Sequence, residues 1–162
     1  MLKQTKALVR RLLPTRMEQW ATRIIRSTEI ALRVYYFKVR NRISEQRLQD
    51  SPNKPIVSLT TFPARLGSVS LAIESIFRQS APPGAVYLWL YEGEISKDEF
   101  PEALQRLEQR GLRIEFVPEN LRGAKKLIYA AKQFPDRIIV TADDDLLYPW
   151  DWLERLECAS RE

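Results

Sequence analysis

The sequence contains no histidine and a single cysteine, Cys158, and these two shortages exclude several kinds of active site. Without histidine, no Ser-His-Asp or Cys-His centre can form within this chain. A typical zinc site is disfavoured for the same reason, because it draws on several histidine or cysteine ligands. One cysteine permits no intrachain disulfide, which fits a reducing compartment.

Glycine-rich phosphate loops and long apolar runs are also missing. The 162 residues include five glycines, and they form neither a Gly-x-Gly-x-x-Gly motif nor a Walker-type loop. A dehydrogenase or a P-loop enzyme is therefore not expected. The apolar runs fall short of the roughly 20 residues that span a bilayer. The N-terminal apolar stretches are short and interrupted by arginines, unlike a secretory signal, so we expect a cytoplasmic protein.

Positive charge is concentrated in the first third of the chain. Residues 1–50 hold 12 basic and 4 acidic side chains, a balance of +8, against 14 and 17 in residues 51–162, a balance of −3. Residues 1–47 show helical spacing of apolar side chains, broken near Pro14, with Leu8, Leu12 and Leu13 on one face before the proline. Such a basic helix can lie as a peripheral contact on the inner face of an anionic membrane, or pack on the domain or a partner with its arginines solvated. No nucleic-acid-binding motif accompanies the charge, so no nucleic-acid partner is predicted.

A polar, proline-bearing linker near residues 49–55 predicts a domain boundary, with a basic helical segment at 1–50 and a second domain at 51–162. Strands are predicted at 56–60, 86–90, 112–117 and 138–140. Helices are predicted at 68–79, at 96–110 in two parts and at 121–134. Strands that alternate with helices indicate an α/β fold, a Rossmann-like parallel sheet with helices on both faces, preceded by the basic N-terminal helices. The expected inward-facing side chains are Val69, Ala72, Ile73, Ile76 and Phe77 on the first helix, and Leu127, Ile128 and Ala131 on the last.

Three consecutive carboxylates, Asp143, Asp144 and Asp145, follow the fourth predicted strand, which is expected to be buried. Alternation along extended chain would place Asp143 and Asp145 on one side and Asp144 on the other. Carboxylates this close repel each other when ionised, and a hard divalent cation is a common neutraliser. Ligands in open α/β sheets gather at the carboxyl ends of strands, where this triplet falls. The triplet can also be a solvated turn or a helix cap.

Three blocks of the sequence resemble the nucleotide-sugar-binding half of GT-A-fold glycosyltransferases, close to the bacterial family-2-like enzymes of surface polysaccharide assembly. They are IVSLTTFPAR at residues 56–65, KKLI at residues 125–128 and VTADDD at residues 140–145. An Asp-x-Asp motif alone is weak, but here it follows a fourth α/β unit and accompanies the loop after the first strand. The resemblance covers residues 55 to about 155.

This resemblance implies a hexosyltransferase-like enzyme that binds a nucleotide-diphosphate sugar with Mn²⁺ or Mg²⁺. The implied metal ligands are Asp143 and Asp145, with Asp145 touching the metal. Cationic side chains suit phosphate oxygens, although two adjacent lysines at a helix start would not both be expected to reach the site. The implied nucleotide-sugar-binding residues are Thr60, Thr61, Phe62, Arg65, Lys125, Lys126, Asp143 and Asp144.

The family's acceptor-binding half normally follows the Asp-x-Asp motif, whereas this chain stops 17 residues after Asp145. We therefore expect the acceptor half to be absent or supplied by a partner chain, and the acceptor to be a glycan or a lipid-linked sugar. One alternative is a non-catalytic binding or scaffold protein with a degenerate nucleotide pocket. A metal-dependent phosphohydrolase is weaker, because no nucleophilic Asp-x-Asp follows the first strand.

Overall fold

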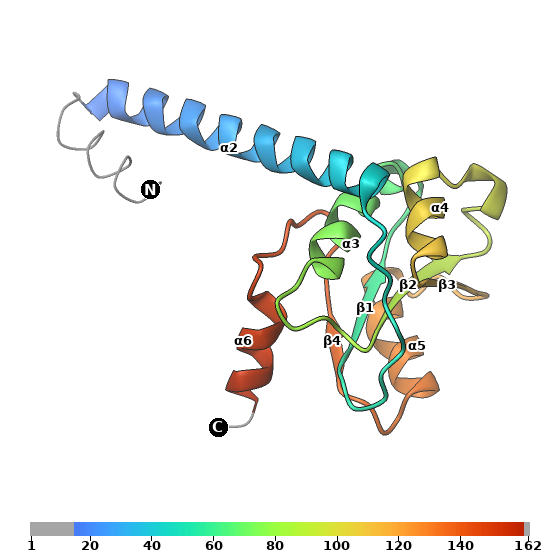
Figure 1. Cartoon of the computed structure of the whole chain (residues 1–162). Helices are drawn as coiled ribbons and strands as arrows, with labels where there is room; N and C mark the ends of the chain where they lie inside the picture. Colours follow the sequence, from blue (N-terminus) through green and yellow to red (C-terminus); the bar gives the residue numbers. More distant parts are fainter. Residues whose placement is uncertain (1–14, 161–162) are drawn as a thin grey trace. The chain divides into compact units, whose positions relative to one another are not determined.

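The computed structural model describes residues 15–160, which fall into two compact units divided between Lys38 and Val39. The first unit is the larger part of helix α2 (Thr15–Ile43), a continuous helix (Figure 1). The predicted Leu8, Leu12 and Leu13 face lies outside the described residues. The domain boundary predicted near residue 50 stays a prediction.

The predicted helix over residues 1–47 runs too far at its C-terminal end, because α2 ends at Ile43. Residues 44–48 belong to the second unit and are held there by hydrogen bonds to other parts of it. The Gln46 side chain donates to the Phe77 carbonyl at 2.7 Å, and the Leu48 N–H donates to the Arg110 carbonyl at 2.9 Å. These hydrogen bonds replace the ones that a continued helix would make.

The second unit contains a four-stranded parallel sheet, which confirms the predicted α/β fold. Its strands are β1 (Ile56–Thr60), β2 (Ala85–Tyr91), β3 (Leu112–Val117) and β4 (Ile139–Thr141). They lie in the order β3-β2-β1-β4. The central strands β1 and β2 are almost wholly buried, as their apolar and β-branched residues require.

Strand β4 lies at the edge of the sheet, and the prediction that it is buried is wrong. It pairs with β1 on one side, in the register Ile56–Ile139 to Ser58–Thr141. Ile139 and Val140 are half-buried, and Ile138 before the strand is 65% exposed. Its apolar run reflects β-propensity more than burial.

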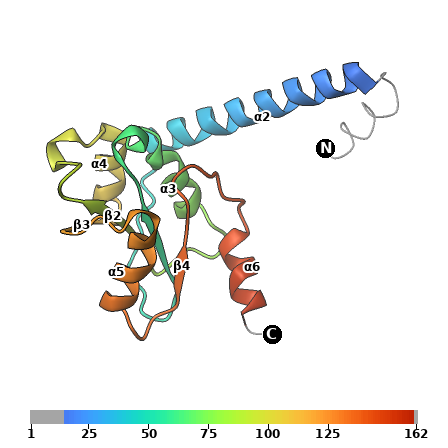
Figure 2. The same cartoon turned by 180° about the vertical axis from the view of Figure 1, so that it is seen from behind.

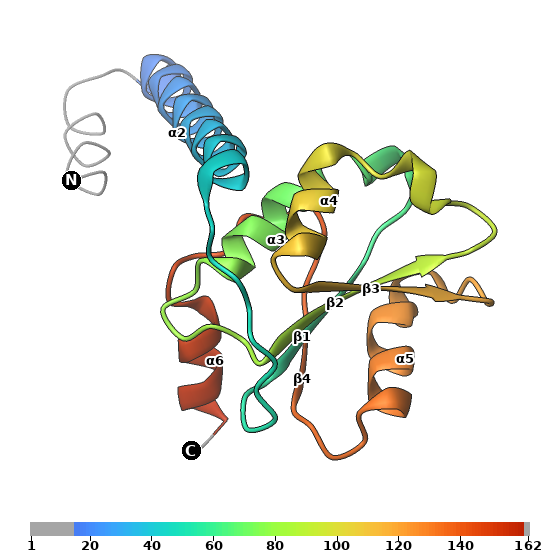
Figure 3. The same cartoon turned by 45° about the vertical axis from the view of Figure 1, so that its right-hand side comes forward.

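Helices cover both faces of the sheet (Figure 3). Side chains of α3 (Val69–Phe77), α4 (Glu102–Gln109) and α6 (Trp152–Ala159) pack on one face, with Val57, Leu59 and Leu88 beneath them. The predicted inner face of α3 is confirmed, since its five predicted side chains are all buried. Short 3₁₀ turns lie at Pro63–Arg65, Lys97–Glu99 and Arg122–Ala124.

Helix α5 (Lys125–Gln133) covers the other face (Figure 2), but with a different rotation from the predicted one. Leu127 is 53% exposed and Ala131 is exposed, so both predicted inward positions are wrong, while Ile128 is half-buried. Ala130 is buried instead, in a cluster with Trp89 and Tyr129. The helix begins only after a 3₁₀ turn, which changes its phase relative to a helix begun at residue 121.

The turn from α4 to β3 requires a glycine. Gly111 has φ +106°, and a Cβ at this position would lie 2.6 Å from the Leu48 carbonyl oxygen. The preceding Arg110 is buried and donates to Glu74 at 2.5 Å and to the Gln46 carbonyl at 2.9 Å. Backbone and side-chain contacts at this turn therefore hold residues 44–48 against the second unit.

We expect Gly111→Ala to destabilise the protein, because a side chain at positive φ costs about 1–3 kcal/mol before the contact with Leu48 is counted. A domain of this size loses about 2–4 °C in Tm per kcal/mol, so thermal unfolding should show a drop of about 5 °C. Gly67→Ala is the matched control, since a Cβ there meets nothing within 4 Å. Equal Tm values for the two variants would contradict the proposed constraint.

Candidate functional site

A cavity of about 480 Å³ lies at the carboxyl-end side of the strands, where ligands of parallel α/β sheets gather. The residues that line it lie at or after the ends of β1, β2, β3 and β4, or begin α5. They are Thr60, Thr61, Phe62, Arg65, Glu94, Asn120, Arg122, Gly123, Lys125, Lys126, Asp143 and Asp144.

The eight residues predicted to bind a nucleotide sugar all line this cavity. Asp145, the predicted metal ligand, does not line it, although it lies beside Asp144 in the chain. The expectation that at most one of Lys125 and Lys126 would reach the site is wrong. Both lie at the first turn of α5, where the preceding 3₁₀ turn brings the chain along the cavity wall.

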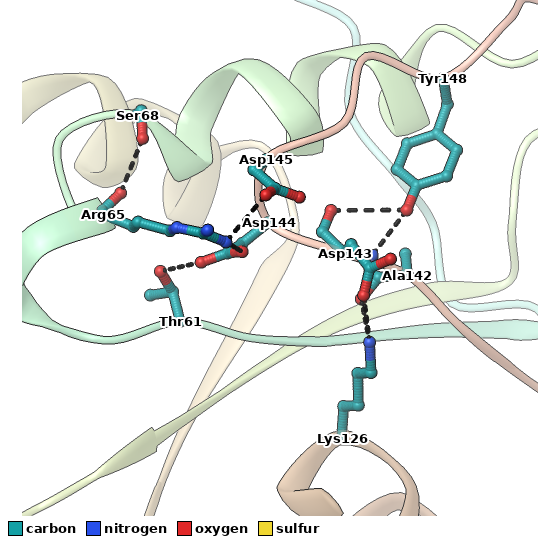
Figure 4. A network of polar contacts seen from close by, with 9 residues as sticks. All are labelled: Thr61, Arg65, Ser68, Lys126, Ala142, Asp143, Asp144, Asp145 and Tyr148. Carbon is teal, nitrogen blue, oxygen red and sulfur yellow. Dashed lines mark hydrogen bonds and ion pairs between the residues drawn. The ribbon is translucent and has the colours of Figure 1, made fainter. Parts of the chain in front are cut away.

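The acidic triplet divides between two cationic side chains (Figure 4). Asp144 is buried and accepts from the Thr61 hydroxyl at 2.6 Å and from Arg65 Nη1 at 2.7 Å. Asp145 meets the same Arg65 Nη1 at 3.0 Å. Asp143 instead accepts from Lys126 Nζ at 2.5 Å. Each carboxylate therefore pairs with a cation from another part of the chain, and Arg65 is shared between two of them.

The predicted alternation, with Asp143 and Asp145 on one side, is wrong. The strand ends at Thr141, and Asp144 and Asp145 belong to a turn. Side chains alternate only along extended backbone, so the turn brings the neighbours Asp144 and Asp145 to one guanidinium. The hydrogen bond and the charge interaction between Arg65 and Asp144 raise the pKa of Arg65.

Tyr148 fixes the backbone of the acidic turn from the side of α3. The Asp143 N–H donates to the Tyr148 hydroxyl at 2.6 Å, and the Tyr148 N–H donates to Ser75 Oγ at 2.9 Å. Burial raises the pKa of Tyr148, the hydrogen bond with the Asp143 backbone opposes this rise, and the charges of the three aspartates add to it. Tyr148 therefore stays a neutral phenol that orients the triplet.

A polar chain of three side chains forms another wall of the cavity. Asn120 donates to Glu94 Oε1 at 2.9 Å and accepts from Lys125 Nζ at 3.2 Å. The side-chain amide oxygen of Asn120 also accepts from the backbone N–H of Arg122 at 3.1 Å, which holds Arg122 at φ 51°. Lys125 is 2% exposed, and this burial lowers its pKa while Glu94 opposes the change.

The sequence analysis missed Glu94, Asn120, Arg122 and Gly123 as lining residues. Glu94 follows β2, and the other three follow β3. Neither of these strand ends carries a sequence motif. The rule that ligands gather at the carboxyl ends of parallel strands points to both ends but names no individual residue there.

The carboxylates of Asp143 and Asp145 fit a divalent cation that takes its remaining ligands from a bound substrate. Within residues 15–160, no three acidic, histidine or cysteine side chains are grouped to hold a metal ion. Asp143 and Asp145 have side chains 58% and 49% exposed and carry the hard oxygen atoms that Mg²⁺ and Mn²⁺ prefer. Mg²⁺ is commonly held by one or two carboxylates together with substrate phosphates, a number that this triplet can supply.

No family model matches the sequence, and no curated protein matches it. The chain is similar to a solved structure of a mannosyltransferase from Pyrobaculum calidifontis in complex with GDP-Man and Mn²⁺. The match has 20% sequence identity and a TM-score of 0.47, and it covers 79% of this chain. The chain spans 39% of the length of that protein. A match at this level does not support a fold assignment, so the α/β fold is assigned from the parallel sheet and the helices of this chain alone.

The buried hydroxyl of Thr61 depends on Asp144 for its acceptor, so we expect Asp144→Ala to destabilise the protein. Leaving a buried polar group without a partner costs about 1–3 kcal/mol. Thermal unfolding should therefore show a Tm lower by about 5 °C. Asp143→Ala, which removes an exposed carboxylate of the same triplet, should change the Tm by no more than about 2 °C. A larger loss in Asp143→Ala would contradict the central position of Asp144.

Proposed function

We propose that residues 51–162 form the donor-binding domain of a glycosyltransferase that uses a nucleotide-diphosphate sugar. The observation that carries the proposal is the cavity at the carboxyl ends of the strands, where four cationic side chains meet two aspartates of the triplet and a glutamate. Arg65, Arg122, Lys125 and Lys126 line it, together with Asp143, Asp144 and Glu94. A diphosphate needs cationic partners, and a metal bound to a diphosphate needs carboxylates.

In this proposal Asp143 and Asp145 would hold Mn²⁺ or Mg²⁺, which would neutralise the charge of the departing nucleoside diphosphate. Asp144 would act as a positioning residue, because it holds Arg65 and Thr61 rather than facing the ligand freely. Arg65, Lys125 and Lys126 would bind phosphate oxygens. Thr60, Thr61 and Phe62, at the end of β1, would contact the nucleoside.

The acceptor would be a glycan or a lipid-linked sugar in polysaccharide or glycolipid assembly on the cytoplasmic side of a membrane. A partner chain or a further segment would supply the acceptor-binding half. This part of the proposal follows from the resemblance of the three sequence blocks to family-2-like enzymes.

A second candidate is a non-catalytic binding protein that keeps the cavity and does not use a metal. One observation favours it. Arg65 and Lys126 already form ion pairs with all three carboxylates of the triplet, as in a structural ion-pair network. The two candidates differ in whether nucleotide binding depends on a divalent cation.

Calorimetric titration of UDP, GDP and their sugar conjugates into the chain, with Mn²⁺ and then with EDTA, separates the two candidates. We expect one nucleotide to bind with Mn²⁺ and to lose most of its affinity in EDTA. Asp145→Asn should weaken the metal-dependent binding by at least about 10–100-fold, the loss typical of a residue that only supports a ligand, since it removes a carboxylate that would bind the metal directly. Asp151→Asn, outside the cavity lining, is the control. Binding that EDTA leaves unchanged would favour the non-catalytic protein, and no binding at all would refute the donor site.

Lys125→Met should weaken nucleotide binding by about tenfold without lowering the Tm at neutral pH, because the variant removes a cation that burial disfavours. Burial lowers the pKa of Lys125, so the unfolded chain holds its proton more tightly than the folded one. Stability should then rise with pH between the lowered pKa and the ordinary value of 10.5, and Lys125→Met should abolish this rise. Lys132→Met, an exposed lysine of the same helix, is the control. A strong loss of stability in Lys125→Met would give this lysine a structural role instead.

A further inference from the structure

Helix α2 carries large apolar side chains that the structure leaves exposed. Trp20 is 66% exposed, Ile24 46%, Leu32 64% and Tyr35 68%. Trp20, Ile24, Ala31 and Tyr35 follow one another at intervals of four, seven and four residues, which places them on one side of the helix. An apolar stripe of this size on a helix normally marks a contact surface.

A neighbouring side of the same helix is mainly basic, and it also carries Ile30, which is 51% exposed. Arg23, Arg26 and Arg33 are exposed and spaced by three and seven residues, so they share a side that the apolar stripe does not occupy. Lys38 is also an exposed cation, but it lies five full turns after Trp20 and therefore at the end of the apolar stripe. Glu29 is the acidic residue between Gln19 and Lys38, and it binds Arg33 at 3.2 Å. The net charge of residues 19–38 is therefore +3.

This pattern does not match a helix that pairs with a second copy of the chain. A two-stranded coiled coil needs apolar residues at both seam positions of every heptad. With Trp20 and Ile24 on the seam, the next seam positions are Ser27, Ala31, Val34 and Lys38. A serine and a lysine would interrupt the seam at two of these four positions.

The pattern does match a helix that lies in the plane of a lipid surface. Helices of this kind have Trp, Leu and other large apolar residues on one side and Lys and Arg beside them. Tryptophan and tyrosine are enriched at the level of the lipid headgroups, and each arginine near an anionic surface favours binding. None of the helices formed by the described residues is long and apolar enough to cross a membrane.

We propose that residues 19–38 of helix α2 bind the surface of an anionic lipid bilayer. Trp20, Ile24 and Tyr35 insert among the headgroups, while Arg23, Arg26 and Arg33 pair with lipid phosphates and carboxylates. The contact belongs to the first unit and does not depend on the proposed donor site.

The test is co-sedimentation of the full chain with vesicles of phosphatidylcholine alone and of phosphatidylcholine mixed with phosphatidylserine. We expect binding to the mixed vesicles, weaker binding to neutral ones, and a loss of binding as salt is raised. Arg23→Gln with Arg26→Gln should lower the partition into mixed vesicles about fivefold for each arginine. Trp20→Ala with Tyr35→Ala should lower it by more than about tenfold, because most of the inserted aromatic surface is removed.

Gln19→Ala with Thr22→Ala is the matched control, since both residues are exposed and lie away from the apolar stripe. This pair should bind mixed vesicles as the unchanged chain does, with the same helix content by circular dichroism. Equal binding to neutral and anionic vesicles would overturn the proposal, as would undiminished binding by the Trp20 and Tyr35 pair. Absent vesicle binding, with a dimer that this pair dissociates in sedimentation velocity, would assign the face to a second copy. Nucleotide titration of the same variants reports on the donor site separately.

Discussion

The pairing of three adjacent carboxylates with two cationic side chains is the interaction on which the cavity depends. Asp143, Asp144 and Asp145 would repel one another if left alone at a sheet edge. Arg65 reaches them from the turn after β1, and Lys126 reaches them from the start of α5. Three segments distant in the sequence are thereby held around one cavity. Because Arg65 serves both Asp144 and Asp145, the turn that carries these two residues is tied to the first strand.

The rotation of α5 is fixed by polar groups as well as by apolar packing. The Ser58 hydroxyl donates to the Lys126 carbonyl at 2.5 Å and accepts from the Trp89 indole at 2.8 Å. Two buried central strands thus hold the first turn of α5 in register. Ala130 then packs on the sheet, and Lys125 and Lys126 both face the cavity. The same contact that completes the core therefore positions two of the cationic side chains.

The sequence was sufficient to predict the order of the four strands and of the helices between them, because period and turn residues are local signals. Eight residues of the cavity wall were implied by the resemblance of three sequence blocks to glycosyltransferases. The predictions that failed depend on where an element ends and on contacts between distant segments, and neither is visible in the local pattern. Leu127 and Ala131 were placed inside because the pattern does not show where the 3₁₀ turn before α5 ends. The alternation of the aspartates failed because β4 ends at Thr141, before the triplet. Glu94 and Asn120 lie after strands that carry no motif, and only their meeting in space marks them.

The wall formed by Asn120, Arg122 and Lys125 bears on whether the cavity is a binding site or a solvated depression. Burying an ammonium group is unfavourable, and the lowered pKa of Lys125 reflects this. A non-glycine residue at positive φ is also unfavourable, and Arg122 is held at 51° beside a glycine that would adopt this conformation easily. A solvated turn requires neither feature. The buried ammonium group of Lys125 and the positive φ of Arg122 each place a cation along the cavity that Asp143 and Asp144 also line. The two unfavourable contributions to stability therefore fall where an anionic ligand would offset them.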